Sequence, residues 1–328
     1  MKRLFFLLVL AAAAWAVFSI QVPTGPESES FLEIAPGTPS MKIAALLKQQ
    51  GLIRSQYLFE VTHLVKGGTL KAGEYRFDHP AKIAEVYDRL RRGDVYTISL
   101  TIPEGSNLFD ISERVAAAHF TSKEQFLATA RADVKLIADL DPAATSLEGY
   151  LFPNTYRFGR KTTAEQILTA MVKQFRQSAA GLGLHANYRR VVTMASLIER
   201  ETPIDAERPL VASVFENRLA KDMPLMTDPS VIYAALLDGR YRGTIYASDL
   251  EASSPYNTYR HAGLPPGPIC NPGKASLQAA MNPAQTGYFY FVAASANPSG
   301  VSKFSATLAE HDRNVQDYRK AQREAGTR

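Results

Sequence analysis

The sequence predicts a mixed α+β protein with an apolar N-terminal helix, a small α/β module and a larger α+β domain. Helical patterns alternate irregularly with short β-rich segments at 73–77, 97–103 and 288–293, without the regular βαβ order of a parallel sheet. A chain of 328 residues, 46% of them hydrophobic, can form two cores. We therefore divide it into a membrane segment (1–21), a linker (22–30), a small domain (31–97) and a large domain (98–328).

The N-terminal apolar segment predicts an uncleaved membrane anchor. Seventeen uncharged residues, Leu4 to Ile20, follow Lys2-Arg3; this run is short for a membrane span but long for the core of a signal peptide. The segment Gln21–Pro26 has no good cleavage signal, although a cleaved signal remains the alternative. The leading positive charges place the N-terminus in the cytoplasm. We expect a single-pass protein of the cytoplasmic membrane whose remaining domains lie outside it.

The small domain combines a helix that ends at Gly51, a strand at 73–77 and a helix at 83–90. This order of strand, turn of small residues and amphipathic helix resembles a LysM-like module. The resemblance implies binding to the glycan of peptidoglycan. A spacer that holds the next domain away from the membrane is the alternative.

A weak internal repeat links the two domains. Ile34–Gly37 and Ile102–Gly105 both place a glycine three residues after an isoleucine, and Ile43 and Ile111 each follow six residues after that glycine. The spacing predicts two copies of a strand–turn–helix unit. Chance similarity between two Pro-Gly turns remains open.

Composition and motifs exclude several classes of protein. The net charge of +5 is mild and no Lys/Arg block is interleaved with aromatic residues, so we expect no nucleic-acid partner. The single cysteine, Cys270, cannot form an intramolecular disulfide and is expected to pack in a proline-rich loop. Glu310-His311-Asp312 lacks a second histidine at metal-binding spacing, so His311 is expected to cap or pack beside a C-terminal helix. We expect no metal and no cofactor.

A carboxylate interrupts the apolar face of the segment Met194–Pro203. At 100° per residue, Glu201 falls in the same stripe as Val191, Met194, Ala195, Leu197 and Ile198. Pro203 predicts that the helix ends at this point. Burial and the negative end of the helix dipole should both raise the pKa of Glu201, which would suit a general acid. The alternative is a solvated last turn of a core helix. Glu199 lies off the stripe and is expected to be far more replaceable.

Polar, proline-stiffened segments surround this helix in the sequence. Residues 148–156 combine a carboxylate with three aromatic rings, a combination typical of carbohydrate clefts and also of ordinary cores. Further rigid polar loops occur at 226–230, 254–259 and 263–273. Binding sites are often built from loops of this kind.

Taken together, these segments resemble the YceG-like, MltG-type endolytic murein transglycosylases. The matching segments are EGYLFPNTY (148–156), MASLIERET (194–202), VASVFENRL (211–219), TDPSVIYA (227–234), SPYNTY (254–259), GLPPGPICNPG (263–273), YFYFVA (288–293), Phe304 and HDRNVQDYR (311–319). The resemblance implies an anchored enzyme that cuts the β-1,4 bond between N-acetylmuramic acid and N-acetylglucosamine inside peptidoglycan strands, forming 1,6-anhydro ends. It also implies partnership with membrane peptidoglycan synthases and termination of nascent strands.

The resemblance assigns the catalytic glutamate to Glu201. Glu201 would protonate the glycosidic oxygen and then act as base on the muramyl C6 hydroxyl, so that one carboxylate serves both steps. Glu148 would support it, by orienting substrate or by raising its pKa through like-charge proximity. The residues expected to bind sugar hydroxyls or acetamido groups are Tyr150, Asp228, Tyr256 and Asn257.

The sequence departs from the family pattern in two places, and two rival functions remain. Met226 stands where the resemblance leads us to expect glutamine, and residues 100–145 match little that we can identify. A muramidase would instead pair Glu148 with Glu201 and release reducing ends. A wall-binding scaffold would need neither acid.

Overall fold

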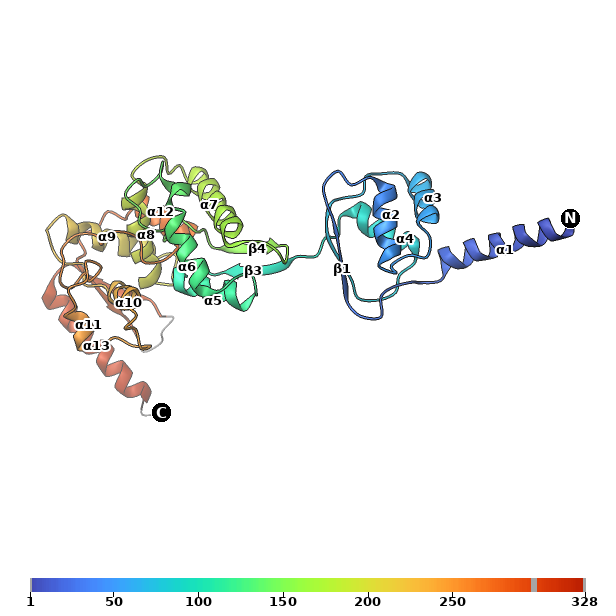
Figure 1. Cartoon of the computed structure of the whole chain (residues 1–328). Coiled ribbons are helices and arrows are strands. Elements are labelled where there is room, and N and C mark those ends of the chain that lie inside the picture. Colours follow the sequence, from blue (N-terminus) through green and yellow to red (C-terminus); the bar gives the residue numbers. More distant parts are fainter. Residues whose placement is uncertain (1, 296–299, 327–328) are drawn as a thin grey trace. The chain divides into compact units, whose positions relative to one another are not determined.

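The structure is a computed structural model that describes residues 2–295 and 300–326. It is of the mixed α+β class that the sequence predicts. The chain forms two compact units, Met1–Ile98 and Ser99–Arg328, which are described separately below (Figure 1).

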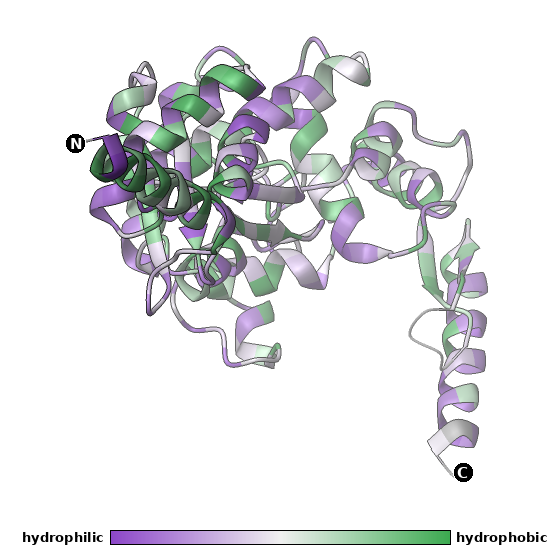
Figure 2. Cartoon of the chain, turned by 90° about the vertical axis from the view of Figure 1, so that its right-hand side faces the viewer, coloured by the Kyte–Doolittle hydropathy of each residue, from purple (hydrophilic) through white to green (hydrophobic). Residues whose placement is uncertain are grey.

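Helix α1 (Lys2–Gln21) is long and apolar enough to cross a membrane, with a mean hydropathy of 2.2 over its best 18-residue window. Its large side chains, from Leu4 to Phe18, are mostly exposed, and Figure 2 shows a nearly continuous hydrophobic helix at the N-terminus. So large an apolar surface is unfavourable in water. This helix is consistent with the predicted anchor.

The first unit is a two-stranded sheet covered by helices. Strand β1 (Ser30–Ile34) pairs antiparallel with β2 (Gly73–Phe77), and Leu32 lies opposite Tyr75. Helices α2 (Ser40–Gln49) and α3 (Gln56–Lys66) connect the strands, and α4 (Ile83–Arg92) follows. The core lies between sheet and helices and includes Leu32, Ile43, Leu47, Phe59, Tyr75 and Tyr87.

Part of the predicted linker at 22–30 is held to this unit by hydrogen bonds. The backbones of Thr24 and Ala81 exchange two hydrogen bonds of 2.9 and 3.0 Å. Arg54 donates to the carbonyls of Val22 and Pro23. Proline and glycine content predicts an irregular backbone but does not show whether other residues pair with it.

The second unit begins with the order of elements that follows α1 in the first unit. Strand β3 (Ile98–Ile102), α5 (Leu108–Ala117), α6 (Lys123–Ala132), β4 (Asn154–Phe158) and α7 (Ala164–Gly181) repeat the order β1, α2, α3, β2, α4, with a short 3₁₀ helix (Val134–Ile137) inserted before β4. Strand β3 pairs with β4. Gly37 and Gly105 occupy the turns with φ of +76° and +75°, a region that favours glycine. The structure therefore confirms the strand–turn–helix repeat and extends it to five elements.

Helix α8 (Tyr188–Glu201) runs through the centre of the second unit. It packs against α9 (Arg208–Leu219), α10 (Asp228–Leu237) and α12 (Lys274–Met281). Every residue from Val192 to Ile198 is buried, so the predicted single stripe was too narrow. Ser196 is tolerated inside because its hydroxyl donates to Thr193 O and accepts from Ile269 N.

The chain ends with a hairpin and a long helix. After the short α11 (Ala247–Leu250) and α12, strand β5 (Tyr290–Ala293) pairs antiparallel with β6 (Ser302–Ser305), and α13 (Leu308–Gly326) follows. The spacing of apolar residues within 208–219 predicts a helix, and α9 has these bounds. The spacing within 164–175 predicts another helix, which in the structure continues to Gly181.

Candidate active site

Glu201 is the last residue of α8, as the proline signal predicts. Thr202 leaves the helix in an extended conformation with φ −141° and ψ 133°. The Glu201 side chain lines a cavity of about 460 Å³. The other residues that line it are Phe215, Arg218, Leu225, Met226, Thr227, Asp228, Tyr259, Tyr290, Phe291, Leu308 and His311.

The surroundings of Glu201 raise its pKa from 4.5 to about 7. Burial is the largest cause, and the carboxylate of Asp228 adds to it. The positive charges of Arg218 and Arg200 oppose the rise. The group therefore exists in both protonation states near neutral pH, as an acid that must also act as a base requires.

Asp228 enters the cavity at the start of α10, where Pro229 occupies the first turn. Its Oδ1 accepts a 2.6 Å hydrogen bond from the hydroxyl of Tyr259. Burial and this hydrogen bond raise the pKa of Tyr259, so that its hydroxyl stays a donor. Of the predicted binding residues, Asp228 is the one that the structure brings into the cavity of Glu201.

Met226 also lines this cavity, at the position where we expect glutamine. Its backbone has a positive φ of 53°, and its side chain is exposed. A thioether cannot replace the hydrogen bonds of an amide. This wall of the cavity therefore offers an apolar contact.

Arg218 is a cavity residue that the sequence analysis missed. Its Nε donates to Phe289 O at 2.7 Å and its Nη1 to Leu225 O at 2.8 Å. The guanidinium lies 5.4 Å from the centre of the Tyr290 ring. The helical pattern of residues 208–219 places Arg218 only at the edge of that helix. Its spacing of three from Phe215, which also lines the cavity, was the available signal.

His311 closes another side of the cavity from α13. Its ring stacks on Tyr290, with centroids 5.2 Å apart, which agrees with the predicted packing role beside the C-terminal helix. Burial lowers the pKa of His311, so the neutral imidazole is favoured. The neighbouring Glu310 accepts a hydrogen bond from Ala306 N at the start of the helix.

Glu148 lies in a different place from Glu201. It is 3% exposed and borders a separate cavity of about 130 Å³ together with Tyr150 and Tyr256. Its Oε2 accepts from Leu108 N and its Oε1 from the Asn271 amide, both at 2.9 Å. Burial raises the pKa of Glu148 to about 8. The like-charge effect on Glu201 that we predicted for Glu148 comes instead from Asp228.

Tyr150 and Asn257 are buried structural residues, contrary to their predicted contact with sugar. The Tyr150 hydroxyl donates to Asp141 at 2.9 Å. The Asn257 amide donates to the carbonyls of Leu250 and Ala252, and its Oδ1 accepts from Tyr259 N. The residue types predict a polar loop, but only the fold decides whether the polar side chains form hydrogen bonds within the protein. Because Asn257 accepts a hydrogen bond from the backbone of Tyr259, it helps to position Tyr259, which lines the Glu201 cavity.

Asn271 is a second residue that the sequence analysis missed. It is fully buried and joins three loops. Its Oδ1 accepts from Leu151 N at 2.8 Å, and its Nδ2 donates to Ser106 O and Glu148 Oε1, each at 2.9 Å. An amide inside a proline-rich loop was the only signal for it.

Glu199 is held in a buried ion pair with Arg208. Its two carboxylate oxygens accept from the Arg208 guanidinium at 3.1 and 3.2 Å, and Oε2 also accepts from Gly273 N. Both side chains are only 5–6% exposed. That Glu199 is more replaceable than Glu201 for catalysis stays a prediction. For stability the structure adds a cost, because loss of Glu199 leaves a buried guanidinium unpaired.

The geometry of the Glu201 cavity defines a class of site. A half-buried carboxyl of raised pKa, in a cavity with aromatic rings and a second carboxylate, suits an enzyme that protonates a glycosidic bond. The chain belongs to the YceG-like family, whose family model matches residues 32–317.

Relatives and a solved structure agree with this membership. An endolytic murein transglycosylase of Bacillus subtilis is 36% identical over 308 residues, covering 88% of this chain and 84% of the relative. One from Streptococcus pneumoniae is 28% identical over 357 residues, covering 96% of this chain and 64% of the relative. The crystal structure of a YceG-like protein from Listeria monocytogenes is 35% identical, with a TM-score of 0.56, and covers 87% of this chain and 99% of that one.

Proposed function

We propose that this chain is an endolytic lytic transglycosylase that cleaves the β-1,4 bond between N-acetylmuramic acid and N-acetylglucosamine inside peptidoglycan strands. The single observation that carries the proposal is Glu201, a carboxyl with a pKa of about 7 in an aromatic-lined cavity. The relatives from B. subtilis and S. pneumoniae, named endolytic murein transglycosylases, support it. Cleavage inside a nascent strand would terminate it.

Glu201 performs both proton transfers in this proposal. Its carboxyl donates a proton to the glycosidic oxygen, which leaves with the electron pair of the broken bond to the muramyl C1. The new carboxylate lies in the same cavity as the charge of Arg218. It then takes the proton of the muramyl C6 hydroxyl while that oxygen bonds to C1, which closes the 1,6-anhydro ring.

Asp228 and Tyr259 assist the charge changes around Glu201. The Asp228 carboxylate faces the cavity where positive charge develops on the sugar ring in the transition state. Tyr259 fixes that carboxylate through its 2.6 Å hydrogen bond. Arg218 is held by two backbone carbonyls and does not need to reorient during the reaction.

The other domains place the enzyme at its substrate. We assign α1 as a single-pass anchor with a cytoplasmic N-terminus and the rest of the chain outside the membrane. The order β1, α2, α3, β2 in residues 31–97 supports a LysM-like module that binds the glycan. Membrane peptidoglycan synthases would supply the strands that residues 98–328 cut.

Digestion of purified glycan strands tests the function. Wild type should produce 1,6-anhydro ends by mass spectrometry, and Glu201→Gln should produce none. The matched control is Glu251→Gln, an exposed carboxylate on the same unit, which should cleave normally. Reducing ends in place of anhydro ends would show a muramidase. Unchanged cleavage by Glu201→Gln would exclude Glu201 as the acid.

A further inference from the structure

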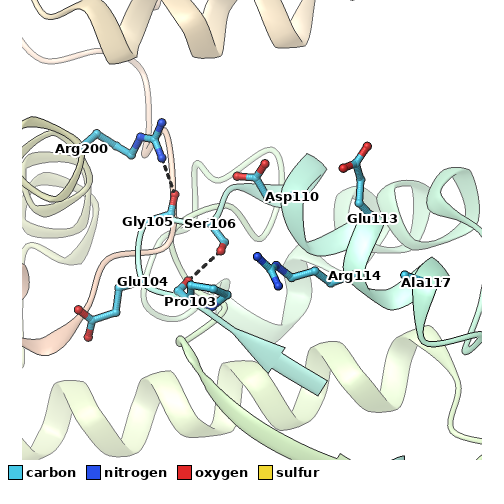
Figure 3. A pocket seen from close by; sticks show the side chains of 9 residues that line it. All are labelled: Pro103, Glu104, Gly105, Ser106, Asp110, Glu113, Arg114, Ala117 and Arg200. Carbon is cyan, nitrogen blue, oxygen red and sulfur yellow. Dashed lines mark hydrogen bonds between the residues drawn. The ribbon is translucent and has the colours of Figure 1, made fainter. Parts of the chain in front are cut away.

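A third cavity, of about 440 Å³, lies at the turn between β3 and α5 (Figure 3). The residues that line it include Glu104, Gly105, Ser106, Arg114 and Arg200. Nothing in the proposed reaction uses this cavity. Yet Arg200 precedes Glu201 directly, and its charge affects the pKa of Glu201, so the two cavities flank the same end of α8.

Two arginines without carboxylate partners contribute the positive charge of this cavity. Within the part of the chain that the structure describes, the guanidinium of Arg114 makes no hydrogen bond or ion pair. Arg200 makes one weak hydrogen bond, of 3.4 Å, to Gly105 O. Figure 3 shows the Arg114 side chain extending across the cavity toward Ser106.

The acids at the rim leave these guanidinium groups available. Asp110 accepts a hydrogen bond from Asn107 N as part of the cap of α5. Glu113 pairs with Lys123 at 2.7 Å. Glu104 lies against the Cα of Gly273, near the buried Glu199–Arg208 pair.

The wall of the cavity is built rigidly. Gly105 N donates to Asn271 O at 3.0 Å, and the amide of Asn271 donates to Ser106 O at 2.9 Å. Asn107 caps α5 by accepting from Asp110 N. A preformed wall reduces the ordering cost of binding.

The lining differs in kind from that of the Glu201 cavity. Among the residues that the structure describes, no aromatic residue lines it, whereas Tyr259, Tyr290 and two phenylalanines line the Glu201 cavity. Sugars stack on aromatic rings, while fixed guanidinium groups suit carboxylates, which they can bind with two parallel hydrogen bonds. The cavity therefore fits a charged peptide better than a sugar.

We propose that Arg114 and Arg200 bind a carboxylate of the peptide stem carried by the same strand whose glycan lies at Glu201. This inference rests on the proposed function for its substrate. A peptidoglycan strand has two sources of carboxylate, namely the stem peptide and the lactyl group that is exposed when the stem is removed. We assign the stem, because the mixed charges at the rim also suit the amino group of its diamino acid.

Binding to the full-length protein in detergent micelles tests the site without catalysis. Isothermal titration uses a soluble tetrapeptide stem, the same peptide with its carboxylates amidated, and free N-acetylmuramic acid, which carries the lactyl carboxylate. The stem should bind at least about tenfold more tightly than either of the others. Arg114→Gln should weaken it about tenfold, and Arg114→Lys should restore part of the loss.

The matched control is Arg131→Gln, an exposed arginine on α6 outside the cavity, which should bind the stem as wild type does. Equal affinity of wild type and Arg114→Gln would overturn the site, and so would N-acetylmuramic acid that binds as tightly as the stem. A failure of the proposed function can be distinguished from a failure of this site. If only the function is wrong, the stem still binds, but wild type forms no anhydro ends.

Discussion

Replacing Glu201 by glutamine should stabilise the folded protein above pH 7. The Glu201 carboxyl has a pKa of about 7 in the folded chain against an ordinary value of 4.5, because burial and Asp228 disfavour its charged form. Between these values the folded state holds more protons than the unfolded state, so stability falls as pH rises. The penalty is absent below pH 4.5 and complete above pH 7. A neutral amide avoids it.

The size of the effect follows from the two pKa values. At 1.36 kcal/mol per pKa unit, the rise from 4.5 to about 7 corresponds to about 3 kcal/mol at pH 8. At pH 5 the same calculation leaves less than about 1 kcal/mol. In a unit of this size, each kcal/mol moves the melting temperature by about 2–4 °C. Glu201→Gln should therefore melt about 6–12 °C above wild type at pH 8.

Thermal melting by circular dichroism between pH 5 and pH 8 measures this difference. Wild type, Glu201→Gln and the exposed control Glu251→Gln are compared in the same detergent. The gap between Glu201→Gln and wild type should widen with pH, while Glu251→Gln should follow wild type. A gap that stays constant over the pH range would refute the raised pKa, and with it the physical argument for the acid.

Three further predictions concern the ion pair of Glu199, the charges around Glu201 and the buried amide of Asn271. Glu199→Gln should lower the free energy of unfolding by about 3 kcal/mol in denaturant titrations, yet the folded variant should still form anhydro ends; loss of cleavage in that variant would contradict a purely structural role. Asp228→Asn should lower the pKa of Glu201, and Arg218→Gln should raise it. The alkaline limb of the pH profile of kcat/KM should therefore move to lower pH in the first variant and to higher pH in the second. Limbs that move in the same direction would contradict the roles of these two charges. Asn271→Ala should cost about 2–4 kcal/mol in the same titrations, because it leaves several buried polar groups unpaired; a change below about 1 kcal/mol would show that the loops hold without it.

Much of the fold could be predicted from local patterns. Glu201 was placed at a helix end by the proline two residues later, and the helix at 208–219 was bounded correctly. The repeat was detected from the spacing between isoleucine and glycine in two turns, because a left-handed turn requires the same residue type in each copy. These signals act over a few residues and are therefore visible in one sequence.

The composition of the site was harder to predict. The helical pattern places Arg218 only at the edge of its helix, although its guanidinium is fixed in the cavity by backbone carbonyls. Tyr150 and Asn257 have the residue types of a sugar site, but their polar atoms are used within the protein. Glu199 lies off the apolar stripe and is nevertheless buried, because α9 supplies Arg208 to pair with it.

The sequence by itself determined the fold class, the apolar anchor helix, the helix that carries Glu201 and the segments that gather around it. Only the tertiary structure decided which acid lies beside Glu201, placing Asp228 in its cavity and Glu148 in another. The physical reason is that a pKa depends on burial and on charges brought by other elements. Contacts such as that of Asn271 with Ser106 span 165 residues, and no local sequence pattern predicts them.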